Sequence, residues 1–384
     1  MKFVVAALIS MFLVGCAAPL PLPPSADLLR DELFVPPSTP VDAGQAMAVS
    51  PEMRRYLDER IVGVSHFGDH KRRLVEMLYN RDELRLEYDA VQTRTASQAF
   101  AARAGNCLSL VMMTGALARE LGVNVRYQLV LGNELWDRST GLYISVGHVN
   151  LTLADRPPQF LGAFMRNELP LTIDFLPPRD GHAPRTRAIE EHTVVAMFLN
   201  NRAVESLVAG RTDDAYWWVR EALRIDPQLV DAYITLGVVY RNRGLTESAE
   251  QVLRRASVRE PDNTKILANR VLVLRDMGRD AEATALAQTL ARLESVPPFR
   301  YFYDGMAALR AGRPEAARDL FSKEVARAPY HAEFHFWLAV SYAELNDPGH
   351  AAKYLARAME VSTTRRDHDL YASKLARLKA LHVQ

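Results

Sequence analysis

The chain has 384 residues, of which 48% are hydrophobic and 24% are charged, and its formal net charge is +1. This length and composition are typical of a folded protein with two or three domains. A nearly neutral chain gives no reason to expect a nucleic-acid partner, because such binding needs a concentrated basic face.

The first 16 residues have the layout of a secretory signal. A single lysine, Lys2, precedes an apolar stretch from Phe3 to Val14, which Gly15 and Cys16 follow. The end of this stretch resembles the lipobox of bacterial lipoproteins, in which the cysteine is lipidated and becomes the first residue of the mature chain. The resemblance implies a protein anchored through a lipid on Cys16, with Ala17 permitting sorting to the outer membrane, where the protein would face the periplasm. The alternative is an uncleaved amphiphilic N-terminus.

Residues 17–50 are predicted to form a linker. Seven prolines lie between positions 19 and 40. Proline interrupts both helices and interior strands, so this composition favours an extended, semi-rigid spacer. Such a spacer would hold the folded part of the protein away from the bilayer, and the lipid would be the only attachment to the membrane.

Residues 51–190 are predicted to form an α+β domain. Charged helical patterns occupy residues 51–89. An apolar helix begins at Cys107 after a Gly-Asn turn signal and ends at Gly122. Alternating or apolar runs then predict strands over residues 123–131, 143–153 and 171–177.

Three residues of this domain form a candidate catalytic group. Cys107 is the only cysteine besides Cys16, and its place at a helix N-terminus favours a thiolate. His148 lies on the less apolar face of its predicted strand, and Asp174 is an acid amid apolar neighbours that needs a partner. In this arrangement the thiolate attacks a carbonyl, the imidazole moves the proton, and the carboxylate orients the imidazole.

The order and spacing of these residues resemble the transglutaminase-like superfamily, whose fold is papain-like. The resemblance rests on Gly105-Asn106-Cys107-Leu108-Ser109, Gly147-His148-Val149 and Ile173-Asp174-Phe175, and covers residues 90–180. It implies a cysteine peptidase, an amidase or an acyl transferase, although some members have lost activity. Backbone N–H groups at the helix start would stabilise the oxyanion, with Asn106 and Gln98 as further candidate donors.

Each catalytic candidate also has a structural interpretation. A lone cysteine on an apolar helix is often a small core residue, a strand histidine is often a hydrogen-bonded structural residue, and an aspartate at a strand end is often a cap. Their joint occurrence in one order favours the catalytic interpretation. With one available thiol and no close Cys/His pair, the sequence predicts no metal site and no cofactor.

The second half has a period of 34 residues. Ala215, Ala249, Ala283, Ala317 and Ala351 keep this step, as do Gly210, Gly244, Gly278 and Gly312, with Asn346 in the fifth place. The glycines and the asparagine are predicted to end the first helix of each repeat in the left-handed conformation. The small alanine would let a second helix pack closely against the first.

This pattern resembles the tetratricopeptide repeat. The residues that occupy the family's signature places in the second unit are Tyr233, Leu236, Gly237, Tyr240, Ala249, Leu253, Ala256 and Pro261. The resemblance implies five repeats over residues 196–363, a capping helix within residues 364–384, and a concave groove for a protein or peptide partner. The alternatives are that the array packs only against its own N-terminal domain, or that it dimerises.

Two hypotheses of function follow. The first is an envelope-anchored transglutaminase-like thiol enzyme that uses Cys107, His148 and Asp174, with the repeats recruiting a protein or peptide; a cell-wall amidase would differ only in its substrate. The alternative is a catalytically inactive scaffold lipoprotein that assembles envelope proteins through its repeats.

Overall fold

The computed structural model describes residues 26–63, 70–80, 83–84, 86–89, 92–139, 142–154, 170–175, 185–293, 299–329, 331–362 and 365–381. The predicted signal, Cys16 and the beginning of the predicted linker lie outside these ranges. Within them, no helix combines the length and the apolar character that crossing a membrane requires.

The N-terminal half is an α+β domain, as the sequence predicts. Its helices are η1 (Ala26–Leu28), η2 (Asp31–Leu33), η3 (Ala43–Gln45), α1 (Pro51–Leu57), η4 (Asp58–Val62), α2 (His70–Tyr79), α3 (Ala96–Ala102) and α4 (Cys107–Glu120). Its strands are β1 (Glu87–Tyr88), β2 (Ala104–Gly105), β3 (Asn124–Ser139), β4 (Leu142–Ala154), β5 (Leu171–Ile173) and β6 (Thr186–Ile189). Strands β1 and β2 pair in parallel, and the other four form an antiparallel sheet in the order β5-β4-β3-β6.

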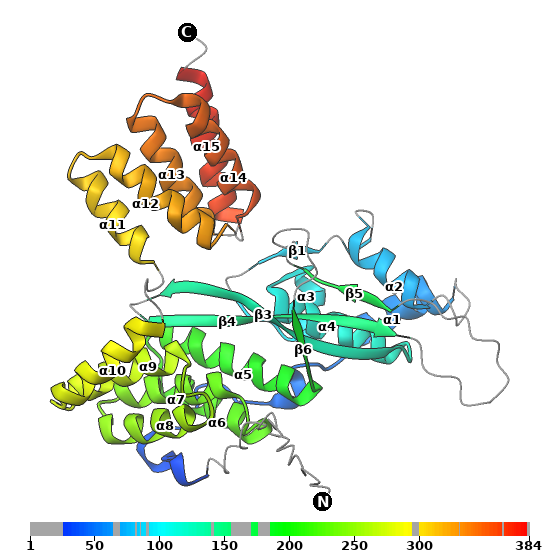
Figure 1. Ribbon diagram of the computed structural model, residues 1–384. Helices are drawn as coiled ribbons and strands as arrows, with labels where there is room; N and C mark the ends of the chain where they lie inside the picture. Colours follow the sequence, from blue (N-terminus) through cyan, green and yellow to red (C-terminus); the bar gives the residue numbers. More distant parts are fainter. Residues whose placement is uncertain are drawn as a thin grey trace, which may run out of the picture.

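Helix α4 packs against one face of the larger sheet (Figure 1). On β4 the apolar residues Val149, Leu151 and Leu153 are fully buried in the core that contains α4. The alternation of the strand therefore turns His148 to the other face, as predicted. Gly122 follows α4 with a φ of 72°, the left-handed conformation that ends the helix.

The C-terminal half is a series of antiparallel helix pairs. The pairs are α5 (Glu191–Val208) with α6 (Thr212–Ile225), α7 (Val230–Asn242) with α8 (Thr246–Arg259), α9 (Thr264–Asp276) with α10 (Asp280–Leu293), α11 (Arg300–Arg310) with α12 (Pro314–Arg327), and α13 (Ala332–Glu344) with α14 (Pro348–Glu360). A last helix, α15 (Arg365–Leu381), follows the fifth pair. Gly210, Gly244, Gly278, Gly312 and Asn346 all have positive φ, between 56° and 78°, which confirms the predicted left-handed turns.

Two buried apolar clusters hold these helices. The larger cluster is continuous from Leu28 through the α+β domain to Val273 in the third helix pair. The second begins at Phe299 and joins α11 to α14. Figure 1 accordingly shows α5–α10 beside the sheet and α11–α15 as another group of helices.

The prediction of a spacer over residues 17–50 is wrong for residues 27–50, which pack against the folded protein. Residues 27–38, here called the N-terminal strap, lie along α6, α7 and α8. Leu28 and Phe34 are only 1% and 6% exposed. The Phe34 ring stacks on the Tyr216 ring with the two centroids 3.9 Å apart. Leu28 and Phe34 precede the two prolines of the strap, Pro36 and Pro37, and the burial of these apolar side chains outweighs the extended preference of the neighbouring segments.

Charge complementarity also holds the strap. Asp31 accepts two hydrogen bonds at 2.9 Å from Nε of Arg220, and Asp27 forms an ion pair with Arg255. The Tyr240 hydroxyl donates to the carbonyl of Leu28 at 2.6 Å. These contacts join the N-terminal segment to the first two helix pairs of the array.

Candidate active site

The candidate nucleophile begins helix α4. Cys107 is the first residue of that helix, is 1% exposed, and is a free thiol. Asn106 is the N-cap: its Oδ1 accepts hydrogen bonds from the backbone N–H of Ser109 at 2.9 Å and from the Ser109 hydroxyl at 2.8 Å. The thiol therefore lies at the positive end of a well-capped buried helix.

The small parallel sheet places a tyrosine beside this thiol. Tyr88 on β1 pairs with Gly105 on β2, two residues before Cys107. Burial, together with the neighbouring Cys107 thiol, raises the pKa of the Tyr88 hydroxyl well above its ordinary value. A phenol that keeps its proton is a hydrogen-bond donor next to the sulfur and to the start of the helix.

The strand histidine and the predicted acid are in direct contact. Nε2 of His148 lies 2.8 Å from Oδ1 of Asp174, the residue directly after β5. The second carboxylate oxygen of Asp174 accepts a hydrogen bond from Nδ2 of Asn150 at 3.1 Å. The strand register explains the contact: Leu151 pairs with Ile173, so the next positions, Asn150 and Asp174, also face each other.

Cys107 completes the group. Burial lowers the pKa of His148, but the hydrogen bond with Asp174, the nearby Cys107 and the charges of both residues outweigh it and raise the pKa to about 9. Because Nε2 is bound to Asp174, Nδ1 is the nitrogen left to face the thiol. This buried Nδ1 has no hydrogen bond of ordinary length and angle within the described residues, although Cys107 is near enough to influence the ring. The structure thus brings together all three residues predicted from the sequence.

The raised pKa leads to a titration prediction. In the folded protein we expect the His148 ring to lose its proton with a midpoint near pH 9. In Asp174→Asn the midpoint should fall towards or below the ordinary 6.5, because the burial that lowers the pKa remains while the carboxylate is lost. NMR of ¹³C-labelled histidine rings measures both midpoints, and the signal missing from His148→Gln assigns the resonance. Equal midpoints in the two proteins would contradict the prediction.

The two predicted oxyanion donors have other partners. Asn106 uses its oxygen to cap α4, and its Nδ2 donates to the Thr93 hydroxyl at 2.9 Å. Gln98 is exposed and forms a capping box with Thr95, whose backbone N–H it accepts at 3.0 Å. Both side chains stabilise helix starts, which is what their types do at these positions. Among the described residues, the backbone N–H of Cys107 and the Tyr88 hydroxyl are donors close to the thiol.

Two supporting residues were not assigned roles from the sequence. Asn150 fixes the carboxylate that holds His148, and its position two residues after the histidine on the same strand face was the available signal. Tyr88 had no comparable signal, because a two-residue strand that pairs with a distant partner leaves no periodicity to read.

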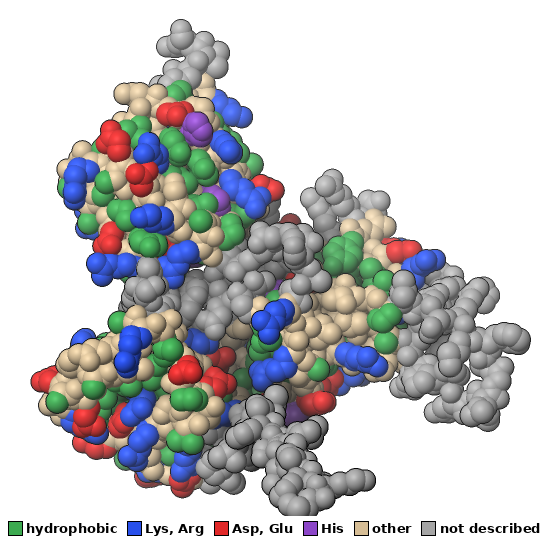
Figure 2. All heavy atoms as spheres, in the orientation of Figure 1, with side chains coloured by type: hydrophobic (Ala, Val, Ile, Leu, Met, Phe, Trp, Pro, Cys, Tyr) green, Lys and Arg blue, Asp and Glu red, His purple; other side chains and the backbone are tan. Residues whose placement is uncertain are grey.

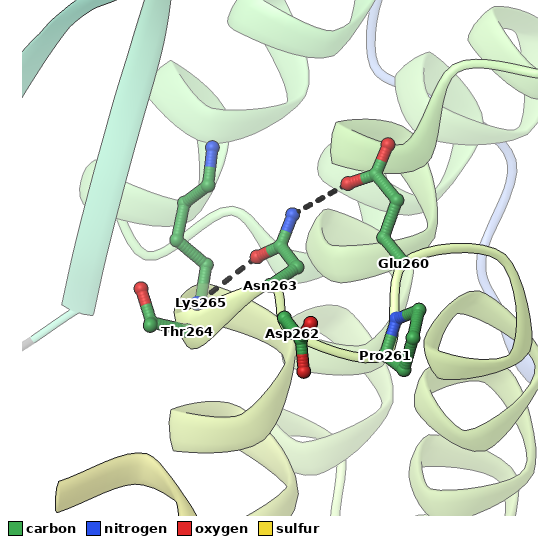
Figure 3. Close-up of a pocket in the computed structure, with 6 residues that line it drawn as sticks. All are labelled: Glu260, Pro261, Asp262, Asn263, Thr264 and Lys265. Atoms are coloured by element: carbon green, nitrogen blue, oxygen red, sulfur yellow. Dashed lines mark hydrogen bonds between the residues drawn. The ribbon is translucent and has the colours of Figure 1, made fainter. Parts of the chain in front are cut away.

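A separate pocket of about 330 Å³ lies at the turn between α8 and α9 (Figure 3). Its lining belongs to this turn and not to the elements that carry the three candidate residues. Asn263 caps α9 and donates to Glu260 at 2.7 Å, and Lys265 pairs with Asp231 at 3.1 Å. Asn263 and Lys265 of this pocket therefore hold the turn together and join it to the start of α7.

Among the described residues, no three or more His, Cys, Asp or Glu side chains lie together in a group that could hold a metal ion. On the face shown in Figure 2, basic and acidic side chains are interspersed over both groups of repeat helices.

Comparison with known proteins concerns the repeats. A family model described as tetratricopeptide repeat matches residues 305–362. No protein with a curated description matches the chain.

Similar solved structures include MamA, which is 19% identical, covers 41% of this chain and 93% of its own, and has a TM-score of 0.24. YrrB, described as a tetratricopeptide-repeat protein with an unusual peptide-binding site, is 21% identical, with coverages of 47% and 92% and a TM-score of 0.25. The pilF protein of Pseudomonas aeruginosa is 20% identical, with coverages of 50% and 87% and a TM-score of 0.29. From the family match and the helix pairs, the C-terminal half of this chain carries tetratricopeptide repeats.

Proposed function

We propose that this chain is a thiol enzyme of the transglutaminase-like class, acting as a cysteine peptidase, an amidase or an acyl transferase. The observation that carries the proposal is the 2.8 Å contact of His148 with Asp174, made by an imidazole that Cys107 also influences at the start of α4. A buried imidazole between a carboxylate and a thiol is the arrangement that nucleophilic catalysis by cysteine requires.

The chemistry divides into two steps. The Cys107 thiolate attacks the substrate carbonyl, and the imidazolium of His148 gives its proton to the leaving amine as the C–N bond breaks. The product is a thioester on Cys107. Water, or a second amine, then attacks the thioester while His148 takes its proton, and the thiolate leaves to regenerate the enzyme. Asp174 holds the ring and stabilises its charged form in both steps.

The repeats supply the second part of the proposal. Tetratricopeptide repeats form extended concave surfaces, which favour binding of a protein or peptide. We place such a partner in the repeat groove, as the recruited substrate or as a part of it. The apolar stretch that ends at Cys16 supports a lipoprotein, and Ala17 after it supports sorting to the outer membrane, where the protein would face the periplasm with the lipid as its membrane attachment.

The decisive variant is Cys107→Ala in the full-length protein, assayed on casein and on purified peptidoglycan by the appearance of new amines. We expect the wild-type protein to act on one of the two, which separates peptidase from amidase. We expect Cys107→Ala to lose this activity completely while it keeps the wild-type unfolding temperature. Activity that persists in Cys107→Ala would rule out the proposed nucleophile.

A second function is favoured by one observation. Cys107 and His148 are only 1% and 2% exposed, as expected for a core that supports a scaffold without turning over a substrate. A catalytically inactive lipoprotein would then assemble envelope proteins through its repeats. In that case Cys107→Ser should restore function in cells that lack the protein, whereas charge reversals on the repeat surface should not.

A further inference from the structure

A hydrogen-bonded chain runs from the first repeat to the start of the nucleophile's helix. Glu205 lies on α5, the first helix of the repeats. Its Oε1 accepts the backbone N–H of Thr93 at 2.6 Å. The Thr93 hydroxyl in turn accepts Nδ2 of Asn106 at 2.9 Å. Thr93 is therefore bound to Glu205 through its backbone N–H and to Asn106 through its hydroxyl.

The other end of this chain caps α4. Asn106 directly precedes Cys107, and its Oδ1 takes the Ser109 N–H and hydroxyl. The Ser109 hydroxyl also accepts the backbone N–H of Arg94 at 2.8 Å. Asn106, Ser109 and Thr93 are nearly or fully buried, so their hydrogen bonds are not exchanged freely with water. Rotation of the Asn106 side chain would leave the first turn of α4, and with it the thiol, without its cap.

We infer that Glu205 is a positioning residue for Cys107: through Thr93 and Asn106, the first tetratricopeptide repeat holds the nucleophile in line with His148. The inference rests on the proposed function, because it concerns the geometry of the same thiol. It assigns to the repeats a part in the active site beyond partner binding. A displacement of α5 is thereby transmitted to the sulfur.

The acceptor capacity of Glu205 is what this role requires. Arg202 also contacts its carboxylate, at 2.8 Å, but a neutral amide can still accept the hydrogen bond from the Thr93 backbone N–H. Glu205→Gln should therefore preserve the alignment, whereas Glu205→Ala removes it. Thr93→Val is a milder second variant, because it deletes the hydroxyl and leaves the backbone N–H in place.

The chain offers a matched control in repeat four. Glu324 on α12 is buried, accepts the backbone N–H of Phe302 at 3.2 Å, and lies near Arg327, three residues on. It repeats the local role of Glu205 in the separate cluster around α11 to α14, with no connection to Asn106. Glu324→Ala therefore measures how far the loss of a buried carboxylate in a repeat affects the alkylation of Cys107 through general stability alone.

The test is the rate at which iodoacetamide alkylates Cys107 in the full-length Cys16→Ser protein, where it is the sole thiol. We expect Glu205→Ala to slow alkylation about tenfold and Thr93→Val several-fold, as the loss of a buried hydrogen bond predicts. Glu205→Gln and Glu324→Ala should stay within about twofold of the wild type. Circular dichroism establishes that each variant is folded, and the His148 titration midpoint should move in Glu205→Ala and Thr93→Val but not in Glu205→Gln or Glu324→Ala.

The outcomes separate this inference from the function on which it rests. Alkylation that depends on His148 but is unchanged in Glu205→Ala and Thr93→Val would overturn the inference and leave the proposed function standing. Equal slowing in Glu205→Ala and Glu324→Ala would overturn it as well, because the effect would then be one of general stability. A wild-type thiol that reacts independently of His148 would overturn both.

Discussion

Replacing His148 with alanine is expected to slow the alkylation of Cys107 near neutral pH by about a hundredfold, the lower end of what a positioned acid–base group contributes. The pKa of about 9 makes the ring positively charged at neutral pH, and this charge beside the sulfur favours the reactive thiolate. The variant removes the charge and leaves the thiol in a buried site. The measurement is the iodoacetamide rate constant in the full-length Cys16→Ser protein.

The control for this experiment is His335→Ala. His335 is also a buried histidine, 3% exposed, but it lies in the fifth repeat and its Nε2 is 2.8 Å from the carbonyl of Pro329. Removing it creates a similar cavity without touching the α+β domain. We expect wild-type alkylation in this variant. An equal loss in both variants would show that the effect comes from destabilisation and not from the imidazole beside the thiol.

The second large effect is expected at the strap. Phe34→Ala should lower the free energy of unfolding by about 3–5 kcal/mol, the range for removal of a buried phenylalanine. The Phe34 ring stacks on Tyr216, and the guanidinium carbon of Arg243 lies 5.6 Å from the centroid of the Phe34 ring. The variant loses both contacts and leaves a cavity. Urea denaturation followed by circular dichroism gives the free energy.

Val35→Ala is the matched control, because Val35 is the next residue of the strap and is 61% exposed. Val35→Ala should change the free energy of unfolding by less than about 0.5 kcal/mol, as other substitutions of exposed residues do. If Phe34→Ala were as mild as Val35→Ala, the strap would be a loosely held segment and the original prediction of a spacer would apply to it after all.

Local patterns in the sequence predicted much of this fold. The period of 34 residues predicted the helix pairs, because each repeat needs a left-handed turn and a small residue at fixed places. In the α+β domain the alternation of β4 predicted which face carries His148. The apolar run after Asn106 predicted that Cys107 begins a helix. These features depend on neighbours within a few residues or on a fixed period, and both can be read from one sequence.

Contacts between distant segments could not be predicted in the same way. Phe34 meets Tyr216 across almost half of the chain, and a single aromatic residue between prolines has no periodicity that reveals its partner. The hydrogen bond of Thr93 with Glu205 also joins two domains. Asn106 and Gln98 show the converse error: both have the right chemistry for an oxyanion donor, but the need to cap a helix determines where their side chains point.

The most direct test of covalent catalysis is mass spectrometry of the full-length Cys16→Ser protein after brief exposure to p-nitrophenyl acetate and an acid quench. The proposed mechanism predicts an acetyl group on the peptide that contains Cys107, which disappears when the protein is left at neutral pH and does not accumulate in His148→Ala. An adduct that never forms, or one that forms and persists equally in the wild type and in His148→Ala, would contradict it.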